Sequence, residues 1–119
     1  MASPTEPYRV LDDQGGIVVG RDPGLSDEQV LRLYRAMVLT RLVDQRMMNL
    51  QRQGRIGFYG TCNGQEAATI GSAFALEDRD WLFPALREGA DAVLRGFPLE
   101  KAVAQNLGNA LDDCKGRQM

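Results

Sequence analysis

The sequence has 119 residues, enough for one domain, and 44% of them are apolar, which is close to the average for globular proteins. It carries 14 basic and 16 acidic residues, a net charge of -2, without the basic cluster that a nucleic-acid or membrane surface would need. Histidine is absent, which excludes Ser-His-Asp and Cys-His catalytic arrangements and histidine-based zinc sites within this chain.

The two cysteines, Cys62 and Cys114, lie far apart and do not form a Cys-x-x-Cys pair. The N-terminus lacks a basic segment followed by an apolar run, and no apolar run approaches the roughly 20 residues that span a bilayer. We therefore expect a cytoplasmic protein with neither membrane nor nucleic-acid partners.

Residues 1–25 are predicted to form an N-terminal arm with a short hairpin. Two apolar runs, at 8–11 and 17–19, flank the turn-forming cluster Asp12-Asp13-Gln14-Gly15-Gly16. Because an isolated hairpin is only marginally stable, we expect it to lie against a larger body or a partner chain.

A long helix is predicted over residues 26–53. Its first four residues, Ser-Asp-Glu-Gln, have the spacing of a capping box, and Gly54 suits a left-handed cap at the other end. The second half carries apolar residues on two sides, so burial within one domain and packing against a second subunit are both open. Arg41 and Asp44 are predicted to pair, because residues three apart are neighbours on a helix.

Glycines and aromatic residues follow in the segment Arg55-Ile56-Gly57-Phe58-Tyr59-Gly60-Thr61-Cys62. Its spacing is not Gly-x-Gly-x-x-Gly and no strand precedes it, so it is not a dinucleotide-binding fingerprint. Glycines allow a close backbone approach, and Phe58 and Tyr59 either line a pocket or simply anchor the loop.

A second helix is predicted over residues 64–76, where Asn63-Gly64-Gln65-Glu66 fits a capping pattern. Its small side chains predict a central helix that other backbones approach closely. The run Trp81-Leu82-Phe83, bounded by a charged loop and Pro84, predicts a short buried strand. Helical patterns follow over 85–94 and 98–107.

Arg87 follows the predicted strand. Ligands of α/β proteins bind beyond the carboxyl ends of strands, so Arg87 is placed to meet an anionic group there. The alternatives are a solvated surface arginine or a pair with Glu88.

From about Tyr8 to the last residue, the sequence resembles the N-terminal portion of the alpha subunit of the decarboxylating component of 2-oxoacid dehydrogenase complexes. The first and last matching segments look most like the branched-chain enzyme, with the pyruvate enzyme second. The segments that carry the resemblance are Tyr8-Arg9-Val10-Leu11-Asp12, Gln51-Arg52-Gln53-Gly54-Arg55-Ile56-Gly57-Phe58-Tyr59, Gly64-Gln65-Glu66-Ala67, Leu86-Arg87-Glu88 and Lys115-Gly116-Arg117-Gln118-Met119.

The resemblance implies an α/β fold, of which this chain is the mostly helical N-terminal portion with one sheet strand, residues 26–119 being an incomplete thiamine-diphosphate-binding domain. It implies an enzyme that uses thiamine diphosphate and magnesium to decarboxylate a branched-chain 2-oxo acid and passes the acyl group to a lipoyl-bearing acyltransferase. A beta subunit would complete an alpha-beta heterotetramer. The metal motif is absent and the activating glutamate belongs to the beta subunit, so we expect no catalytic or metal-binding residue in this piece, which would be inactive alone.

The resemblance also implies site residues. An aromatic-arginine pair holds the diphosphate in that family; Arg87 matches the arginine, and Leu86 occupies the aromatic position without its hydroxyl donor. Phe58 and Tyr59 match an aromatic pair near the substrate pocket. A hypothesis from a different class is a non-catalytic helical module that docks a partner through the second half of its long helix, which carries apolar residues on two sides.

Overall fold

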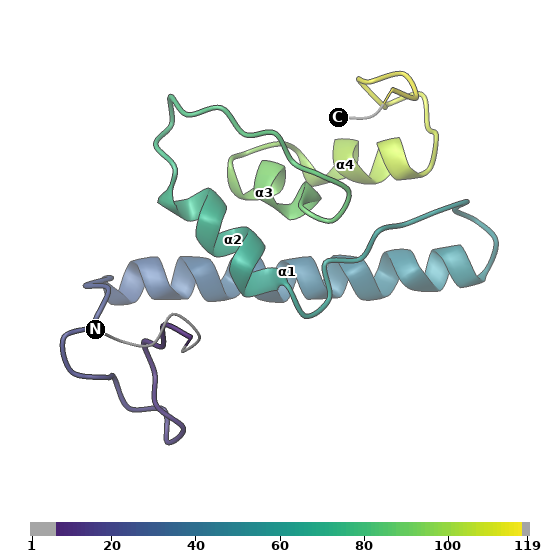
Figure 1. Cartoon of the computed structure of the whole chain (residues 1–119). Helices are drawn as coiled ribbons and strands as arrows, with labels where there is room; N and C mark the ends of the chain where they lie inside the picture. Colours follow the sequence, from purple (N-terminus) through teal and green to yellow (C-terminus); the bar gives the residue numbers. More distant parts are fainter. Residues whose placement is uncertain (1–6, 118–119) are drawn as a thin grey trace. The chain divides into compact units, whose positions relative to one another are not determined.

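The computed structural model describes residues 7–117, and the chain divides into two compact units, Met1–Leu31 and Arg32–Met119. The predicted domain boundary after residue 25 stays a prediction. Within the described range the chain forms four α-helices (Figure 1): α1 (Asp27–Arg52), α2 (Glu66–Ala75), α3 (Gly89–Leu94) and α4 (Leu99–Asn106).

The arm that precedes α1 contains a tight turn. Leu11 and Ile17 form a single antiparallel bridge, and Asp12 Oδ1 accepts hydrogen bonds from the N–H groups of Gln14 and Gly16 at 2.9 and 2.8 Å. The side chains of Leu11 and Ile17 are both more than half exposed, so they gain little of the burial energy that would extend the pairing. The predicted hairpin is not confirmed, since its turn forms but its strands do not.

Both ends of α1 follow from local sequence. The N–H group of Ser26 donates to Gln29 Oε1 at 2.8 Å, and the N–H group of Gln29 donates to Ser26 Oγ at 3.3 Å, which is the predicted capping box. At the other end Gly54 adopts a φ of +71°, and the N–H group of Arg55 donates to the Leu50 carbonyl at 2.9 Å. The predicted long helix is confirmed.

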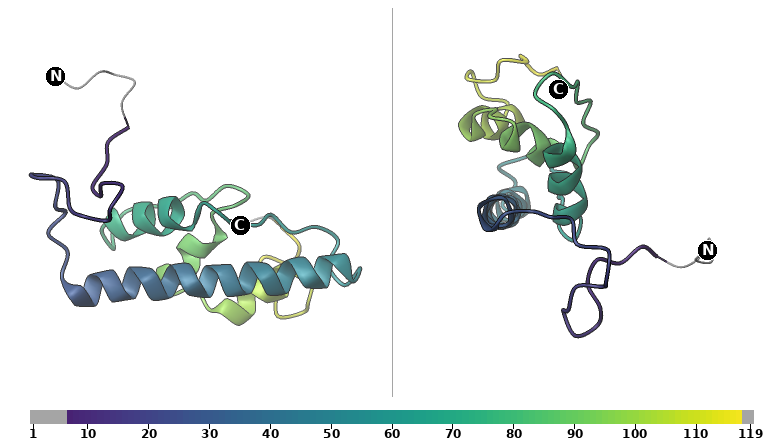
Figure 2. Two further views of the ribbon diagram at one scale, coloured as in Figure 1. Left: turned by 90° about the horizontal axis from the view of Figure 1, so that it is seen from below. Right: turned by 90° about the vertical axis from the view of Figure 1, so that its left-hand side faces the viewer.

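The core of the second unit joins α1, the loop after it and α4. Figures 1 and 2 show α4 running beside the second half of α1. Three buried side chains form the core, with three half-buried ones packed against it: Met47, Leu50 and Ile56, then Val43, Tyr59 and Val103. This small core holds the loop after α1 in place.

The helix α2 buries one side, and most of its small residues lie on the opposite, exposed side. Glu66, Thr69, Ile70 and Ala73 are buried, whereas the small residues at positions 67, 68, 71 and 72 are exposed. The prediction of a tightly surrounded helix is therefore wrong for this chain. Small residues allow a close approach, but burial also requires a neighbour, and the described residues place none on that side.

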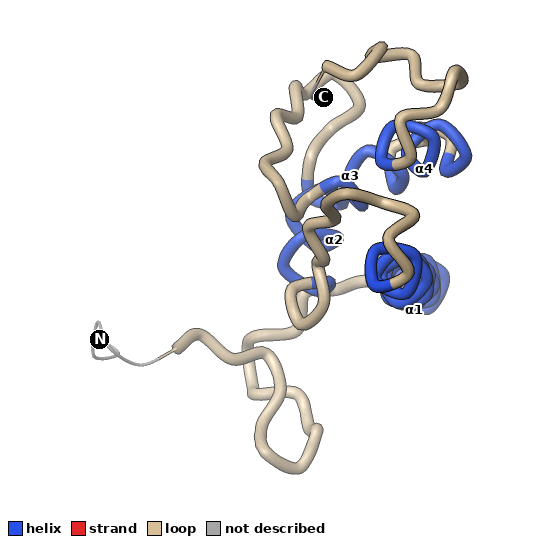
Figure 3. The backbone as a smooth tube through the Cα atoms, turned by 90° about the vertical axis from the view of Figure 1, so that its right-hand side faces the viewer, coloured by secondary structure: helices blue, strands red, loops and turns tan. Residues whose placement is uncertain are grey.

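The predicted buried strand at residues 81–83 is also wrong. Trp81 and Phe83 are 84% and 86% exposed, and their rings stack on each other with centroids 6.2 Å apart. A strand is stabilised by hydrogen bonds to a neighbouring strand. The residues from 7 to 117 form no β-strand with which residues 81–83 could pair (Figure 3). The mostly helical character that we predicted is confirmed.

The third predicted helix begins later than expected. The segment before α3 forms a turn in which the Ala85 N–H group donates to Glu88 Oε2 at 2.5 Å, so residues 85–88 are not helical. The fourth predicted helix agrees with α4, which follows Pro98 and ends before Gly108, whose φ is +60°.

One carboxyl group in α3 is buried at a cost. Asp91 is 3% exposed, and its Oδ1 atom has no hydrogen-bond partner among the described residues. Burial, with a smaller contribution from the nearby Glu88 carboxylate, raises the pKa of Asp91 from 3.8 to about 6. The folded chain therefore disfavours the ionised form. The resulting loss in the free energy of unfolding is absent below the pKa that Asp91 has in the unfolded chain. It grows as pH rises and reaches its full size above the pKa that Asp91 has in the folded chain.

Replacing Asp91 with asparagine is expected to stabilise the chain at neutral pH. Relative to the parent, the free energy of unfolding of Asp91→Asn should rise by roughly 2 kcal/mol between about pH 4 and about pH 7.5. Urea unfolding followed by circular dichroism at the two pH values measures it, with Asp78→Asn on the exposed loop as control. A difference that does not change with pH would contradict the prediction.

Candidate functional site

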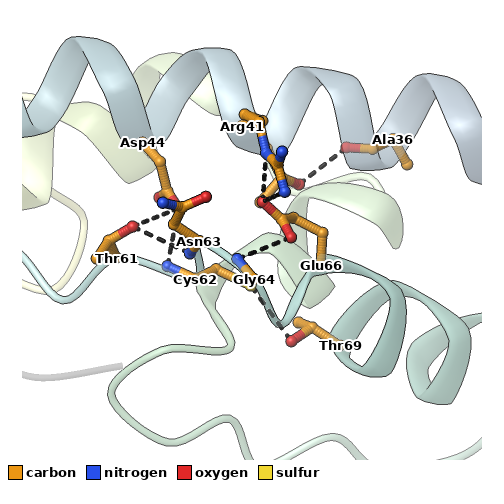
Figure 4. A network of polar contacts seen from close by, with 10 residues as sticks. Ala36, Arg41, Asp44, Thr61, Cys62, Asn63, Gly64, Glu66 and Thr69 are labelled. Atoms are coloured by element: carbon orange, nitrogen blue, oxygen red, sulfur yellow. Dashed lines mark hydrogen bonds and ion pairs between the residues drawn. The ribbon is translucent and has the colours of Figure 1, made fainter.

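The loop after α1 is fastened to that helix by one carboxylate. Asp44 is 3% exposed, and its Oδ1 atom accepts a hydrogen bond from the Tyr59 hydroxyl at 2.6 Å. Its Oδ2 atom accepts two more, from the Thr61 hydroxyl at 2.6 Å and the Cys62 N–H group at 2.8 Å. Figure 4 shows Asp44 pointing from α1 toward Thr61 and Cys62. The carboxylate thus fixes three positions of the loop at once.

These contacts keep the loop's ionisable groups protonated. Burial and the hydrogen bond to Asp44 raise the pKa of the Tyr59 hydroxyl well above its usual range. Burial also raises the pKa of the Cys62 thiol, to which the Asp44 carboxylate adds, against the opposing hydrogen bond with Thr69. Both groups therefore act as neutral partners and not as nucleophiles.

A second polar contact fixes the start of α2. Arg41 does not pair with Asp44 as predicted; its Nη2 atom lies 2.7 Å from Glu66 Oε1, and Nε also donates to that oxygen at 2.7 Å. Glu66 Oε2 accepts the Gly64 N–H group at 3.0 Å. Although burial opposes it, hydrogen bonds from backbone N–H groups and from Arg41 lower the pKa of the Glu66 carboxyl. The protein's own carboxylate thus occupies the anion-binding position at this helix start (Figure 4).

Arg87 is held against the loop that Asp44 fixes. Its Nη1 atom donates a hydrogen bond to the Thr61 carbonyl at 2.8 Å. Glu88, the alternative partner considered from the sequence, instead accepts the Ala85 N–H group. The side chain of Arg87 remains exposed, so the rest of its guanidinium is accessible to a ligand. A chain of contacts therefore runs from Asp44 through Thr61 to Arg87.

A close backbone approach brings the same two segments together. A Cβ atom added at Gly60 would lie 2.9 Å from the Leu86 carbonyl oxygen and 3.0 Å from Leu86 Cγ. The sequence prediction that glycines in this loop permit close approach is confirmed at Gly60, and the approached segment is the one that carries Arg87.

Replacing Gly60 with alanine is therefore expected to destabilise the chain by about 1–3 kcal/mol, because the clash is with backbone and cannot be relieved by a side-chain rotation. Urea unfolding measures the loss. Gly57→Ala is a matched control in the same loop, since a Cβ there meets nothing within 4 Å. Equal stabilities of the two variants would contradict the close approach.

All four site residues predicted from the sequence lie on one cleft. The cleft has a volume of about 580 Å³ and is bounded by α1, the loop at 58–62, residues 84–90, α3, α4 and the last described residues. This volume is within the range of about 300–1,000 Å³ typical of small-molecule sites. Phe58, Tyr59, Leu86 and Arg87 all line it. Much of the remaining lining is apolar, including Leu39, Val43, Leu99 and Val103.

Two residues that shape the cleft were not identified from the sequence. Asp44 and Thr61 organise the cleft, yet Asp44 was assigned to Arg41, and no role was assigned to Thr61. The only signal in the sequence was a lone carboxylate on an apolar side of a long helix, which must find donors elsewhere. Arg117, which also lines the cleft, carried the family resemblance without an expected role.

The family model described as "Dehydrogenase E1 component" matches residues 34–119, which include every residue of the cleft except Arg32. The chain belongs to the dehydrogenase E1 component family. The resemblance inferred from the sequence is therefore confirmed. Members of this family generally depend on thiamine diphosphate, and their alpha subunits generally pair with a beta subunit.

The relatives of this E1 chain include alpha subunits from both animals and bacteria. It is 46% identical over 113 residues to the mitochondrial 2-oxoisovalerate dehydrogenase subunit alpha of Bos taurus, covering 94% of this chain and 25% of the relative. The corresponding Pseudomonas aeruginosa subunit is 45% identical over 111 residues, at 93% and 27% coverage. The pyruvate dehydrogenase E1 component subunit alpha of Staphylococcus aureus is 42% identical over 106 residues, at 87% and 28% coverage. The chain thus spans about a quarter of the length of these relatives.

Two further findings concern membrane-spanning helices and metal sites in the chain. No helix in the part of the chain that the structure describes is long and apolar enough to cross a membrane. Within residues 7–117, no three His, Cys, Asp or Glu side chains gather closely enough to hold a metal ion. The relatives include mitochondrial and bacterial proteins, so the cytoplasmic location stays a prediction.

Proposed function

We propose that the chain is the N-terminal part of the alpha subunit of a branched-chain 2-oxoacid dehydrogenase. The complete enzyme decarboxylates a branched-chain 2-oxo acid and transfers the acyl group to the lipoyl-bearing acyltransferase. It works with thiamine diphosphate and magnesium as an alpha-beta heterotetramer. The chain alone is inactive, because the metal ligands and catalytic groups come from other parts of the assembly.

One observation carries this proposal: Arg87 faces an apolar cleft of small-molecule size together with Phe58, Tyr59 and Leu86. The cleft suits an amphiphilic ligand with an anionic end, because a guanidinium binds phosphate oxygens in a bidentate manner and the apolar wall accepts a ring. Arg87 fits the diphosphate of thiamine diphosphate. Leu86 packs against Gly60 and contributes shape without a hydrogen bond.

The chain's residues have positioning roles in the proposed enzyme. Asp44 orients the loop through Thr61, and the Thr61 carbonyl orients Arg87. When bound, thiamine diphosphate supplies the carbanion-stabilising centre for loss of carbon dioxide from the 2-oxo acid. Phe58, which is 60% exposed, and Tyr59 form part of the substrate wall.

A chimeric alpha subunit tests the proposal. This chain would replace the matching N-terminal residues of the Pseudomonas aeruginosa 2-oxoisovalerate dehydrogenase subunit alpha, co-expressed with the beta subunit of that enzyme. We expect the folded chimera to bind thiamine diphosphate with magnesium, as measured by calorimetry, and to decarboxylate 2-oxoisovalerate. A folded, assembled chimera that binds no cofactor would refute the proposal.

A pyruvate dehydrogenase alpha subunit is the alternative within the family, favoured by the Staphylococcus aureus relative. The same chimera separates the two readings through its preference for 2-oxoisovalerate or pyruvate. Because a larger apolar side chain gains more by burial in the cleft, the branched-chain reading predicts a lower KM for 2-oxoisovalerate. A lower KM for pyruvate favours the alternative.

A non-catalytic interaction module is the alternative from another class. It is favoured by three exposed apolar side chains spaced four residues apart on one side of α1, namely Tyr34, Val38 and Leu42. Light scattering of the chain distinguishes this reading. Self-association that is abolished by Tyr34→Ser with Leu42→Ser favours the module, and a concentration-independent monomer argues against it.

A further inference from the structure

The charged side chains around the cleft are mostly basic. Three arginines, Arg32, Arg87 and Arg117, and one acidic residue, Asp44, line it. The Asp44 carboxylate is buried and accepts three hydrogen bonds from the loop, so the accessible charges of the cleft are cationic. A chain with a net charge of -2 thus gathers positive charge at this cleft.

The last described residues are folded so that Arg117 meets the cleft. Asp112 is 7% exposed; its Oδ1 and Oδ2 atoms accept the N–H groups of Cys114 and Gly116 at 2.8 and 2.7 Å. The Arg117 carbonyl in turn accepts a hydrogen bond from Gln105 Nε2 on α4 at 3.1 Å. The backbone of Arg117 is therefore tied to the wall of the cleft.

The side chain of Arg117 is held less firmly by hydrogen bonds than its backbone. Its Nε atom donates a long hydrogen bond of 3.3 Å to the Cys114 carbonyl, and within residues 7–117 its terminal nitrogens make none. Arg32, in contrast, lies over the Phe74 ring at 5.8 Å from its centroid. Within residues 7–117, the two terminal nitrogens of Arg117 are thus both open to a bidentate ligand.

We propose that Arg117 supplies a second guanidinium contact, together with Arg87, for the anionic ligand of the cleft. The inference rests on the proposed function, because it assigns one more residue to the same site. Each guanidinium can form paired hydrogen bonds with carboxylate or phosphate oxygens, so two of them on one cleft favour an anionic ligand there. The shared chemistry is an oxyanion, either the diphosphate of the cofactor or the carboxylate of the 2-oxo acid.

The experiment titrates the full chain with two simple anions at constant ionic strength. Sodium pyrophosphate stands for the diphosphate, and sodium 2-oxoisovalerate stands for the substrate carboxylate. Binding is followed by the nuclear magnetic resonance signals of the arginine Nε–H groups, compared among the parent, Arg117→Gln, Arg117→Lys, Arg87→Gln and the exposed control Arg79→Gln. Backbone spectra verify that each variant is folded.

We expect Arg117→Gln to weaken binding of at least one anion about tenfold, Arg117→Lys to restore part of it, and Arg79→Gln to leave it unchanged. A loss for pyrophosphate assigns Arg117 to the diphosphate, and a loss for 2-oxoisovalerate assigns it to the carboxylate. If Arg117→Gln matches Arg79→Gln while Arg87→Gln weakens binding, the inference is wrong and the proposed function stands. If no anion binds, or neither Arg87→Gln nor Arg117→Gln has an effect, the inference is wrong, and cofactor binding by the chimera decides the proposed function separately.

Discussion

Replacing Asp44 with alanine is expected to lower the free energy of unfolding by about 3 kcal/mol. The variant loses three hydrogen bonds and leaves the Cys62 N–H group, in a residue that is 3% exposed, without its partner. Burying an unpaired donor costs more than the net gain of the bond itself, which is why this change exceeds an ordinary surface substitution. Urea unfolding of the chain measures it.

Two controls separate the hydrogen bonds of Asp44 from its charge. Asp44→Asn has a similar shape; its oxygen can still accept the Thr61 and Cys62 donors while its amide donates to the Tyr59 oxygen, so it should recover much of the loss. Asp78→Ala removes a carboxylate from the exposed loop and should change stability by less than about 0.5 kcal/mol. An Asp44→Ala variant as stable as Asp78→Ala would show that the carboxylate does not organise the loop.

The second large effect concerns Arg87. In the chimeric alpha subunit, Arg87→Ala is expected to weaken binding of thiamine diphosphate by about 10- to 100-fold, because a charge-assisted bidentate contact contributes about 1.5–3 kcal/mol. Calorimetry with magnesium present measures it.

Arg79→Ala is the matched control for Arg87, since Arg79 is exposed, pairs with Glu77 and does not line the cleft. Its effect on cofactor binding should be negligible. Equal effects of the two variants would remove Arg87 from the cofactor site. A defect of Asp44→Asn smaller than that of Arg87→Ala is also expected, because Asp44 acts only through the loop.

Both ends of α1 could be predicted from the sequence because their signals are local. The capping box at Ser26 and the left-handed Gly54 each depend on residues within a few positions, and both have the expected geometry. Local signals could not decide whether residues 81–83 form a strand. An apolar run indicates only that burial is favourable, and whether it occurs depends on a neighbouring strand that the described residues do not provide.

The residues of the candidate site were predicted, but the hydrogen bonds that position them were not, for a similar reason. The four residues assigned from the family resemblance do share one cleft, although their roles remain proposals. The hydrogen bonds that hold these residues in place were not predicted. The partners of Asp44 lie 15 to 18 positions away in the sequence, and Glu66, the partner of Arg41, lies 25 positions away. Helical spacing suggested an Arg41 to Asp44 pair. The actual partners became available only when the loop and α2 folded back onto α1, which no local pattern encodes.

The exposed position of Trp81 gives the protein a built-in optical reporter. It is the only tryptophan in the sequence, so its emission arises from a single known place, a few residues before Arg87. At 84% exposure it should emit at the long wavelengths of a solvated indole in the chain by itself. Any polypeptide that covers this segment would shift the emission of Trp81 to shorter wavelengths. Assembly around the cleft can therefore be followed without a label.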